Sequence, residues 1–95
     1  MNSKAFIQMA TDLVIDYYNQ NADITDRCPV SKENVFVVWS CYILGNIKAM
    51  LSTNIPDGMY YEITYNEVKH EVYFDAYKKW ENHSYKVEDA DGTTD

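Results

Sequence analysis

Residues 35–43 read VFVVWSCYI, a run of β-branched and aromatic side chains that predicts a β-strand. Apolar side chains occupy both alternating sets of positions, so we expect this strand to be central in a sheet or covered on both faces. The turn residues Leu44-Gly45-Asn46 follow directly, and residues 47–53 resume an extended pattern. The two segments are therefore predicted to form a hairpin.

Two further strands are predicted after this hairpin. Residues 54–58, NIPDG, form a strong turn signal, because proline presets φ and Asp-Gly closes the turn. Residues 59–65 and 70–76 then alternate apolar with more polar side chains, which is the period of a strand with one covered face. Together the four segments predict an antiparallel meander. For residues 77–82 we expect a short helix or turn capped by Asp75, with the end of a long strand as the alternative.

A helix is predicted before the first strand. Residues 3–19 carry apolar side chains at helical spacing, and either Asn2 or Ser3 can cap the first turn. The apolar stripe consists of Phe6, Ala10, Leu13, Val14 and Tyr17. Residues 19–34, rich in Asn and containing Pro29, are expected to form a connecting loop. The predicted fold is therefore α+β, with the N-terminal helix packed on one face of a four-stranded antiparallel meander.

The chain has 95 residues, which is enough for one domain with a single core. We expect that domain to span residues 1–87. Residues 88–95 contain four acidic side chains, and of these residues only Ala90 is apolar, so they are expected to form a flexible acidic tail. One helix can cover only one face of the sheet. We therefore expect something other than this helix to bury the aromatic side chains of the other face.

Charge and composition exclude several classes of function. There are 8 basic and 15 acidic residues, giving a formal charge of −7, and this disfavours nucleic-acid binding. No apolar run is long enough to cross a bilayer, so no membrane association is expected. Two cysteines, Cys28 and Cys41, cannot build a disulfide framework, which favours a reducing cytoplasm.

The motifs of common enzymes are missing, so we expect a protein that is not an enzyme and uses neither cofactor nor metal. Cys41 and His70 are a conceivable nucleophile and base, but a strand cysteine is more often a small buried hydrophobe. A carboxylate pair for acid-base catalysis could come from Asp57, Glu62 and Asp75. However, a turn already explains Asp57 and a helix cap already explains Asp75. Other weak metal candidates are His70 with His83, and the acidic group Asp23, Asp26 and Glu33, which lacks the EF-hand pattern.

Tyrosine is unusually frequent, with nine in 95 residues. Its ring buries a large area while its hydroxyl stays compatible with water, so tyrosine and tryptophan are enriched at protein interfaces. The predicted partner-binding residues are Tyr60, Tyr73, Tyr77 and Trp80. The alternative is that these rings fill the thin core of a small domain.

Three blocks of sequence together resemble a family of small uncharacterised proteins from phages and prophages of Gram-positive bacteria, a domain-of-unknown-function family. They are residues 35–41, residues 51–53 with 57–62, and residues 73–82. The resemblance covers residues 4–82 and omits the acidic tail. It implies a phage-encoded protein that acts in a bacterial cytoplasm, and it carries over no catalytic residue.

The sequence thus predicts a small acidic phage accessory protein that binds a protein partner through a tyrosine-rich surface. The partner is expected to be a host protein, a phage protein or a second copy of the chain. One alternative is a small-ligand binder or small enzyme with a cleft between helix and sheet. The other is an anti-defence inhibitor whose acidic residues mimic the charge of nucleic acid.

Overall fold

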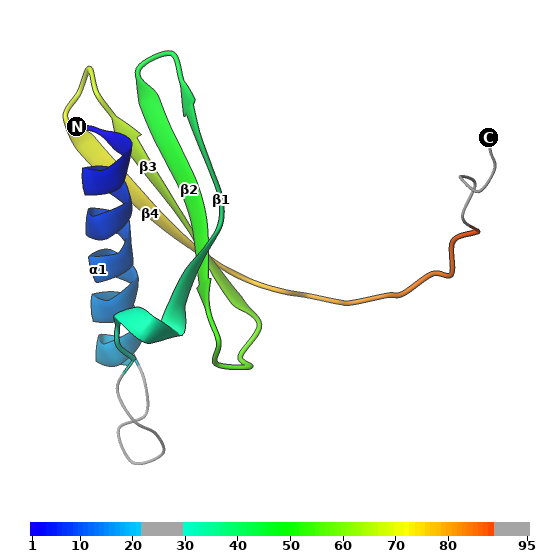
Figure 1. Cartoon of the computed structure of the whole chain (residues 1–95). Coiled ribbons are helices and arrows are strands. Elements are labelled where there is room, and N and C mark those ends of the chain that lie inside the picture. Colours follow the sequence, from blue (N-terminus) through cyan, green and yellow to red (C-terminus); the bar gives the residue numbers. More distant parts are fainter. Residues whose placement is uncertain (22–29, 89–95) are drawn as a thin grey trace.

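The computed structural model describes residues 1–21 and 30–88, and within them one α-helix packs on a four-stranded sheet (Figure 1). Helix α1 spans Ser3–Asn21, and a short 3₁₀ turn, η1, spans Lys32–Asn34. The strands are β1 (Val35–Ile43), β2 (Asn46–Thr53), β3 (Met59–Asn66) and β4 (Glu71–Lys78). All neighbouring strands pair antiparallel in the order β1-β2-β3-β4. The predicted α+β meander is confirmed.

Asn2 caps α1, and it is one of the two residues, Asn2 and Ser3, that were predicted to do so. Its side-chain Oδ1 accepts a hydrogen bond from the Ala5 backbone N–H at 2.7 Å, which satisfies an amide that the helix itself leaves free. At the other end α1 runs two residues further than predicted, to Asn21. The chain that returns towards β1 is tied to the helix by Asn19, whose amide donates to the Val30 carbonyl and accepts from the Val30 N–H.

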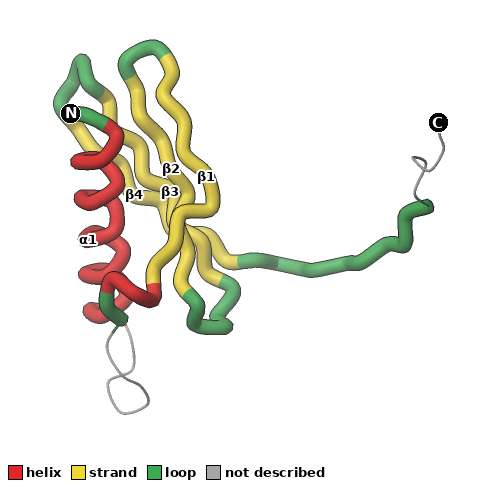
Figure 2. The backbone as a smooth tube through the Cα atoms, in the orientation of Figure 1, coloured by secondary structure: helices red, strands yellow, loops and turns green. Residues whose placement is uncertain are grey.

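The core lies between α1 and one face of the sheet (Figure 2). Phe6, Ala10 and Val14 are fully buried, one turn of helix apart. They pack in a single cluster with buried sheet residues: Ile47, Ala49, Leu51, Tyr61 and Ile63. The rings of Tyr17, Tyr61 and Phe74 lie 5.1 to 5.7 Å apart and close the cluster near the end of the helix. Leu13 and Tyr17 of the predicted stripe are only partly buried, at its margin.

Strand β1 is not covered on both faces, contrary to the prediction from its composition. It is an edge strand, and seven of its nine residues are exposed. Its register with β2 shifts between Val37 and Trp39, so Val38 is the extra residue of a bulge. The bulge reverses the alternation, placing Trp39 beside Met50 and Tyr42 beside the buried Ile47. Simple alternation from Phe36 would have put Tyr42 on the opposite face.

The predicted helical turn at residues 77–82 is wrong. Tyr77 and Lys78 belong to β4 and pair with Tyr60 and Met59, so the alternative of a longer strand holds for these two residues. Residues 79–82 are neither helix nor strand. Asp75 lies inside β4 and caps no helix. The reason is that a strand gains ladder hydrogen bonds for each added residue, whereas an isolated helical turn pays a nucleation cost. Of the predicted acidic tail, only Glu88 lies within the described residues.

We expect Leu51→Ala to lower the free energy of unfolding by about 2 to 5 kcal/mol, because Leu51 is fully buried and its truncation leaves a cavity. Urea denaturation followed by far-ultraviolet circular dichroism measures this change. Leu44→Ala removes the same atoms from a side chain that is 93% exposed. Equal destabilisation by both substitutions would show that Leu51 is not in the core.

Burial raises the pKa of Tyr61 to about 12, and the nearby Asp57 carboxylate adds to the effect. Between pH 10 and 12 the unfolded chain therefore loses the tyrosine proton while the folded chain keeps it, so stability falls as pH rises through this range. We expect Tyr61→Phe to flatten this fall, measured by urea denaturation at pH 9, 10 and 11. An unchanged pH dependence in the variant would contradict the assignment.

Candidate functional site

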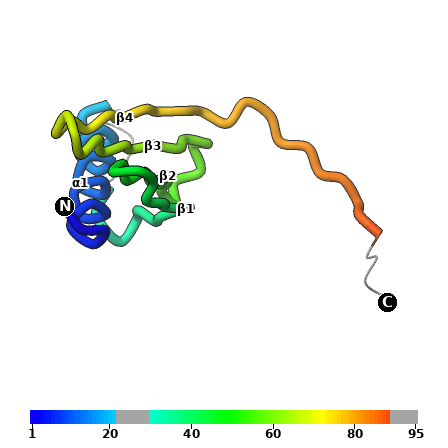
Figure 3. The backbone as a smooth tube through the Cα atoms, turned by 90° about the horizontal axis from the view of Figure 1, so that it is seen from above, coloured from blue at the N-terminus to red at the C-terminus, as the bar shows by residue number. Residues whose placement is uncertain are grey.

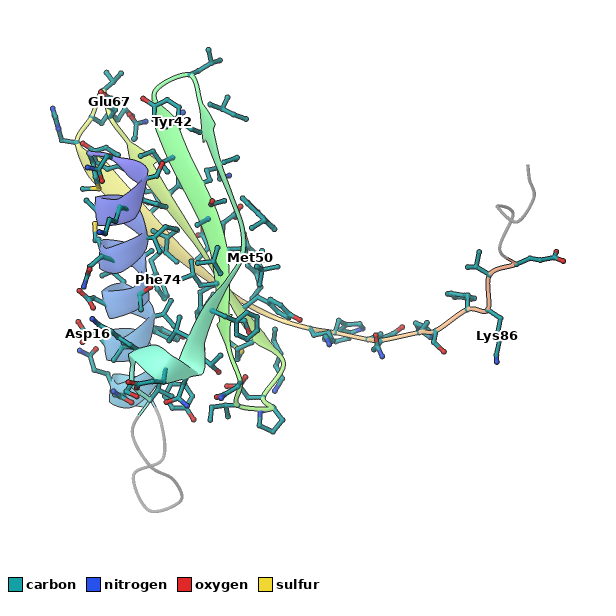
Figure 4. The ribbon with its side chains drawn as sticks, viewed as in Figure 1. Asp16, Tyr42, Met50, Glu67, Phe74 and Lys86 are labelled. Atoms are coloured by element: carbon teal, nitrogen blue, oxygen red, sulfur yellow. The ribbon has the colours of Figure 1, made fainter. Side chains whose placement is uncertain are left out.

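The outer face of the sheet, the side turned away from α1, has no other element of the described chain over it (Figure 3). Cross-strand partners share a face, and side chains alternate along each strand, so the register defines which residues lie there. Met50 marks this side in Figure 4, whereas Phe74 lies between the sheet and α1. The outer face is therefore the surface on which sheet side chains meet solvent.

Five large side chains gather at one end of this face, and we call them the outer patch: Phe36, Trp39, Met50, Tyr60 and Tyr77. Phe36, Ser52, Tyr60 and Tyr77 form one row across the four strands, and Trp39 and Met50 start the next row. Phe36 is 50% exposed, Trp39 39% and Tyr77 49%. The exposed rings on β1 and β4, with the half-buried Met50 and Tyr60 between them, place large apolar side chains on all four strands of this face. Exposed apolar surface of this kind commonly marks an interaction site.

Acidic side chains border the outer patch. Glu62 and Asp75 are direct cross-strand partners, and like charges in such positions repel. Lys48 lies 3.3 Å from Glu62 and offsets one of the two charges. With Glu71, the strands carry one basic and three acidic side chains on the outer face. Lys79, just after β4, adds a second basic group, because its Nζ lies over the ring of Tyr60 at 6.0 Å from the centroid. The resulting net charge of −1 favours a basic group on a binding partner.

Carboxylates raise the pKa of two phenol groups on this face, Tyr73 and Tyr77. The Asp75 carboxylate raises the pKa of Tyr77, and the hydroxyl of Tyr77 also donates to Glu62 at 3.4 Å. A hydrogen bond to Glu71 raises the pKa of Tyr73. Both hydroxyls donate hydrogen bonds to carboxylates of the same face.

Of the four predicted partner-binding residues, the structure brings Tyr60 and Tyr77 together as cross-strand neighbours. Tyr73 lies on the same face, but four residues along β4 from Tyr77. Trp80 lies beyond β4, is 91% exposed and is not part of the outer patch. The sequence analysis missed Phe36, Trp39 and Met50, because only the register of β1 and β2, bulge included, places them beside Tyr60.

A second surface feature is a groove between α1 and the edge strand β1, with a volume of about 550 Å³. Ile7, Thr11, Val35 and Val37 are among its lining residues, and its charged lining residues are Lys4 and Lys32. No acidic residue lines it. The carboxylates Glu62 and Asp75 do not line this groove, because they lie on the other face of the sheet.

The candidate catalytic and metal groups are not assembled in the described residues. Cys41 lies on β1 and His70 precedes β4, at opposite edges of the sheet and roughly 14 Å apart at three strand spacings. Asp57 accepts the Met59 N–H within its turn, which is its predicted local role. Asp23 and Asp26 lie outside the described residues. Within residues 1–21 and 30–88, no group of three or more His, Cys, Asp or Glu side chains is placed to hold a metal ion.

Replacing Tyr60 and Tyr77 together by serine tests whether the outer patch is a surface rather than core. We expect the free energy of unfolding to fall by only about 1 to 2 kcal/mol, the cost of lost strand propensity and one aromatic pair. Binding of an apolar fluorescent dye to the native protein is expected to drop at least twofold.

The matched control is Leu44→Ser with Val68→Ser, which removes two exposed apolar side chains from separate turns. Dye binding should fall less in that control than in the Tyr60 and Tyr77 variant, because Leu44 and Val68 lie at the hairpin tips and outside the outer patch. An equal loss of dye binding in both double variants would contradict the outer patch.

Comparison with known proteins gives a family but no activity. A family model described as "Family of unknown function (DUF6275)" matches residues 7–87. No curated protein and no solved structure matches the chain significantly. Within the described residues, α1 lacks the uninterrupted apolar length that a bilayer-spanning helix needs.

Proposed function

We propose that this chain, which belongs to the family of unknown function DUF6275, is a non-enzymatic protein-binding module. It binds another protein through the outer face of its sheet. The proposed partner is a protein of the host or the phage, or a second copy of the chain. The outer patch is the observation that supports this proposal. The proposal also includes an origin in a phage or prophage of Gram-positive bacteria and action in the host cytoplasm, which the sequence resemblance implies.

The chemistry of the outer patch fits protein recognition better than catalysis. Large rings bury much area at a low cost in side-chain entropy, and Tyr and Trp are enriched among the residues that carry binding energy. Half-exposed Phe36 and Tyr77 supply apolar area, while the hydroxyl of Tyr77 and the Glu62 carboxylate supply polar contacts at its border. An open sheet face of this kind excludes little water, so it does not favour an enclosed reaction.

The charges at the border indicate which partner surface fits. Among the described residues Asp75 has no ion-pair partner, whereas Glu62 forms an ion pair with Lys48. We therefore propose that the partner presents an apolar surface flanked by at least one Lys or Arg. A second sheet is one such surface, because two sheets pack face to face about 10 Å apart with interdigitating side chains.

The groove between α1 and β1 favours the small-ligand alternative by its size, since binding pockets span about 300 to 1,000 Å³. It contains no acidic group for general acid-base work. Charge mimicry gains no support, because Asp12 and Asp16 lie on α1 while Glu62 and Asp75 lie on the opposite side of the sheet. Acidic groups on opposite sides of the molecule do not form one phosphate-like path.

A photoreactive amino acid at position 60 tests the proposed function in cells. We expect p-benzoylphenylalanine in place of Tyr60 to cross-link one defined protein on irradiation, because this position lies in the outer patch. The readout is the mass of the cross-linked species and the identity of the linked protein. Asp75→Lys in the same chain is expected to reduce the yield at least tenfold, since it reverses a border charge that the partner meets.

The control position is 44, where Leu44 is more exposed than any residue of the outer patch but lies at a hairpin tip. A cross-link to the same protein with equal yield from position 44 would overturn the proposal. So would a yield at position 60 that does not respond to Asp75→Lys.

A further inference from the structure

The segment after β4 leaves the body of the protein as an extended arm. We call residues 80–88 the C-terminal arm, because Lys79 is the last residue anchored to the sheet, through its N–H to the Gly58 carbonyl at 2.7 Å. Figures 1 and 3 both show the arm running away from the helix and sheet, with Lys86 far from either in Figure 4. The radius of gyration is 16.9 Å, against about 12 Å for a compact domain of this length.

The arm carries three large apolar side chains that are not buried against the helix or the sheet. Trp80 is 91% exposed, Tyr85 81% and Val87 86%. The recorded polar and ring interactions of the arm are internal, between His83 and its neighbours Glu81 and Tyr85. Holding one residue in an extended conformation costs about 1 to 2 kcal/mol of backbone entropy, which contacts elsewhere have to offset. A Trp and a Tyr on an extended segment form the kind of segment that binds by strand addition.

The edge strand β1 offers the matching surface. It pairs with β2 on one side only, so its outer backbone groups have no strand partner in the described residues. The groove beside it is apolar at Ile7 and Val37 and is large enough, at about 550 Å³, to take an indole ring. Added strands gain affinity from main-chain hydrogen bonds and specificity from pockets that take alternate side chains.

Charge distinguishes this groove from the outer face as the place where the arm docks. The arm carries Glu81 and Glu88 against one lysine, Lys86, for a net charge of −1. The groove is lined by Lys4 and Lys32 with no acidic residue, whereas the outer face has a net charge of −1 when Lys79 is included. Charge therefore favours the groove over the outer face as the docking site of the arm.

We propose that the C-terminal arm of one copy adds to the edge of β1 of a second copy and places Trp80 in the groove between α1 and β1. The arm leaves from β4, at the sheet edge opposite β1, and runs away from its own helix and sheet. Reciprocal exchange closes a two-fold dimer. Each buried aromatic side chain contributes roughly 150 to 250 Å², so two Trp, two Tyr and the surfaces they cover reach the standard interface area of about 1,600 Å².

Sedimentation velocity of the full-length chain and three variants tests the exchange. The arm variant is Trp80→Ser with Tyr85→Ser, the groove variant is Val37→Glu, and the control is Leu44→Ser with Val68→Ser. We expect wild type and control to form a dimer of twice 11.1 kDa. The arm and groove variants should each weaken dimerisation at least tenfold, because each removes one side of the contact.

Mixing the arm variant with the groove variant gives the decisive result. The arm variant keeps an intact groove and the groove variant keeps an intact arm, so together they should form a heterodimer with one docked arm, detected by native mass spectrometry. Lys4→Glu with Lys32→Glu is a second groove variant, whose exposed positions do not affect folding. It should weaken the dimer as Val37→Glu does.

Several outcomes would overturn the exchange, and they are distinct from failure of the proposed function. A monomeric wild type, or a dimer unaffected by Trp80→Ser, rejects it. A dimer abolished by Tyr60→Ser with Tyr77→Ser but not by the arm variant rejects it while supporting the outer face as an interface. A Trp39→Phe variant leaves Trp80 as the tryptophan that fluoresces. If its emission is blue-shifted to the same extent at all protein concentrations, the arm is buried against its own chain, and this result also rejects the exchange.

Discussion

The packing of α1 against one face of the sheet is the constraint on which the rest of the structure depends. Phe6, Ala10 and Val14 meet Ala49 and Leu51 in a dry contact, and the chain has no second helix among its described residues to repeat this on the other side. A four-stranded sheet has two faces, and its strands carry large side chains on both. The outer face is therefore left to solvent or to a partner.

This constraint separates the molecule into a part that provides stability and a part that is free to bind. The buried cluster contains the fully covered Phe6, Leu51 and Ile63, so substitutions there act mainly on folding. The outer patch, the groove beside β1 and the C-terminal arm are all at least partly exposed, so substitutions there act mainly on recognition. Small domains commonly use both faces of a sheet in this divided way, because their single core needs only one of them.

The proposed function and the proposed arm exchange use neighbouring surfaces that share Phe36, which belongs to the outer patch and also lines the groove. The arm docks along the edge of β1, whereas Met50, Tyr60 and Tyr77 of the outer patch lie on β2, β3 and β4. An exchanged dimer would leave these three side chains of both copies available, so a partner with repeated sites would bind it more tightly than a single chain. The acidic border of the outer face disfavours docking of a second copy's arm there.

Sequence alone determined the helix, the four strands and their meander order, since these follow from local periodicity and turn residues such as Pro56-Asp57-Gly58. It also placed Phe6, Ala10 and Val14 towards the sheet and selected Tyr60 and Tyr77 as surface candidates. Only the tertiary structure decided that β1 is largely exposed, that Val38 forms a bulge and that Trp39 joins Tyr60 on the outer face. Register and bulges depend on contacts between residues distant in the chain, and a one-residue slip moves every later side chain to the other face. For the same reason composition could not show that Trp80 stands on a free arm: what leaves it exposed is the absence of a neighbouring element.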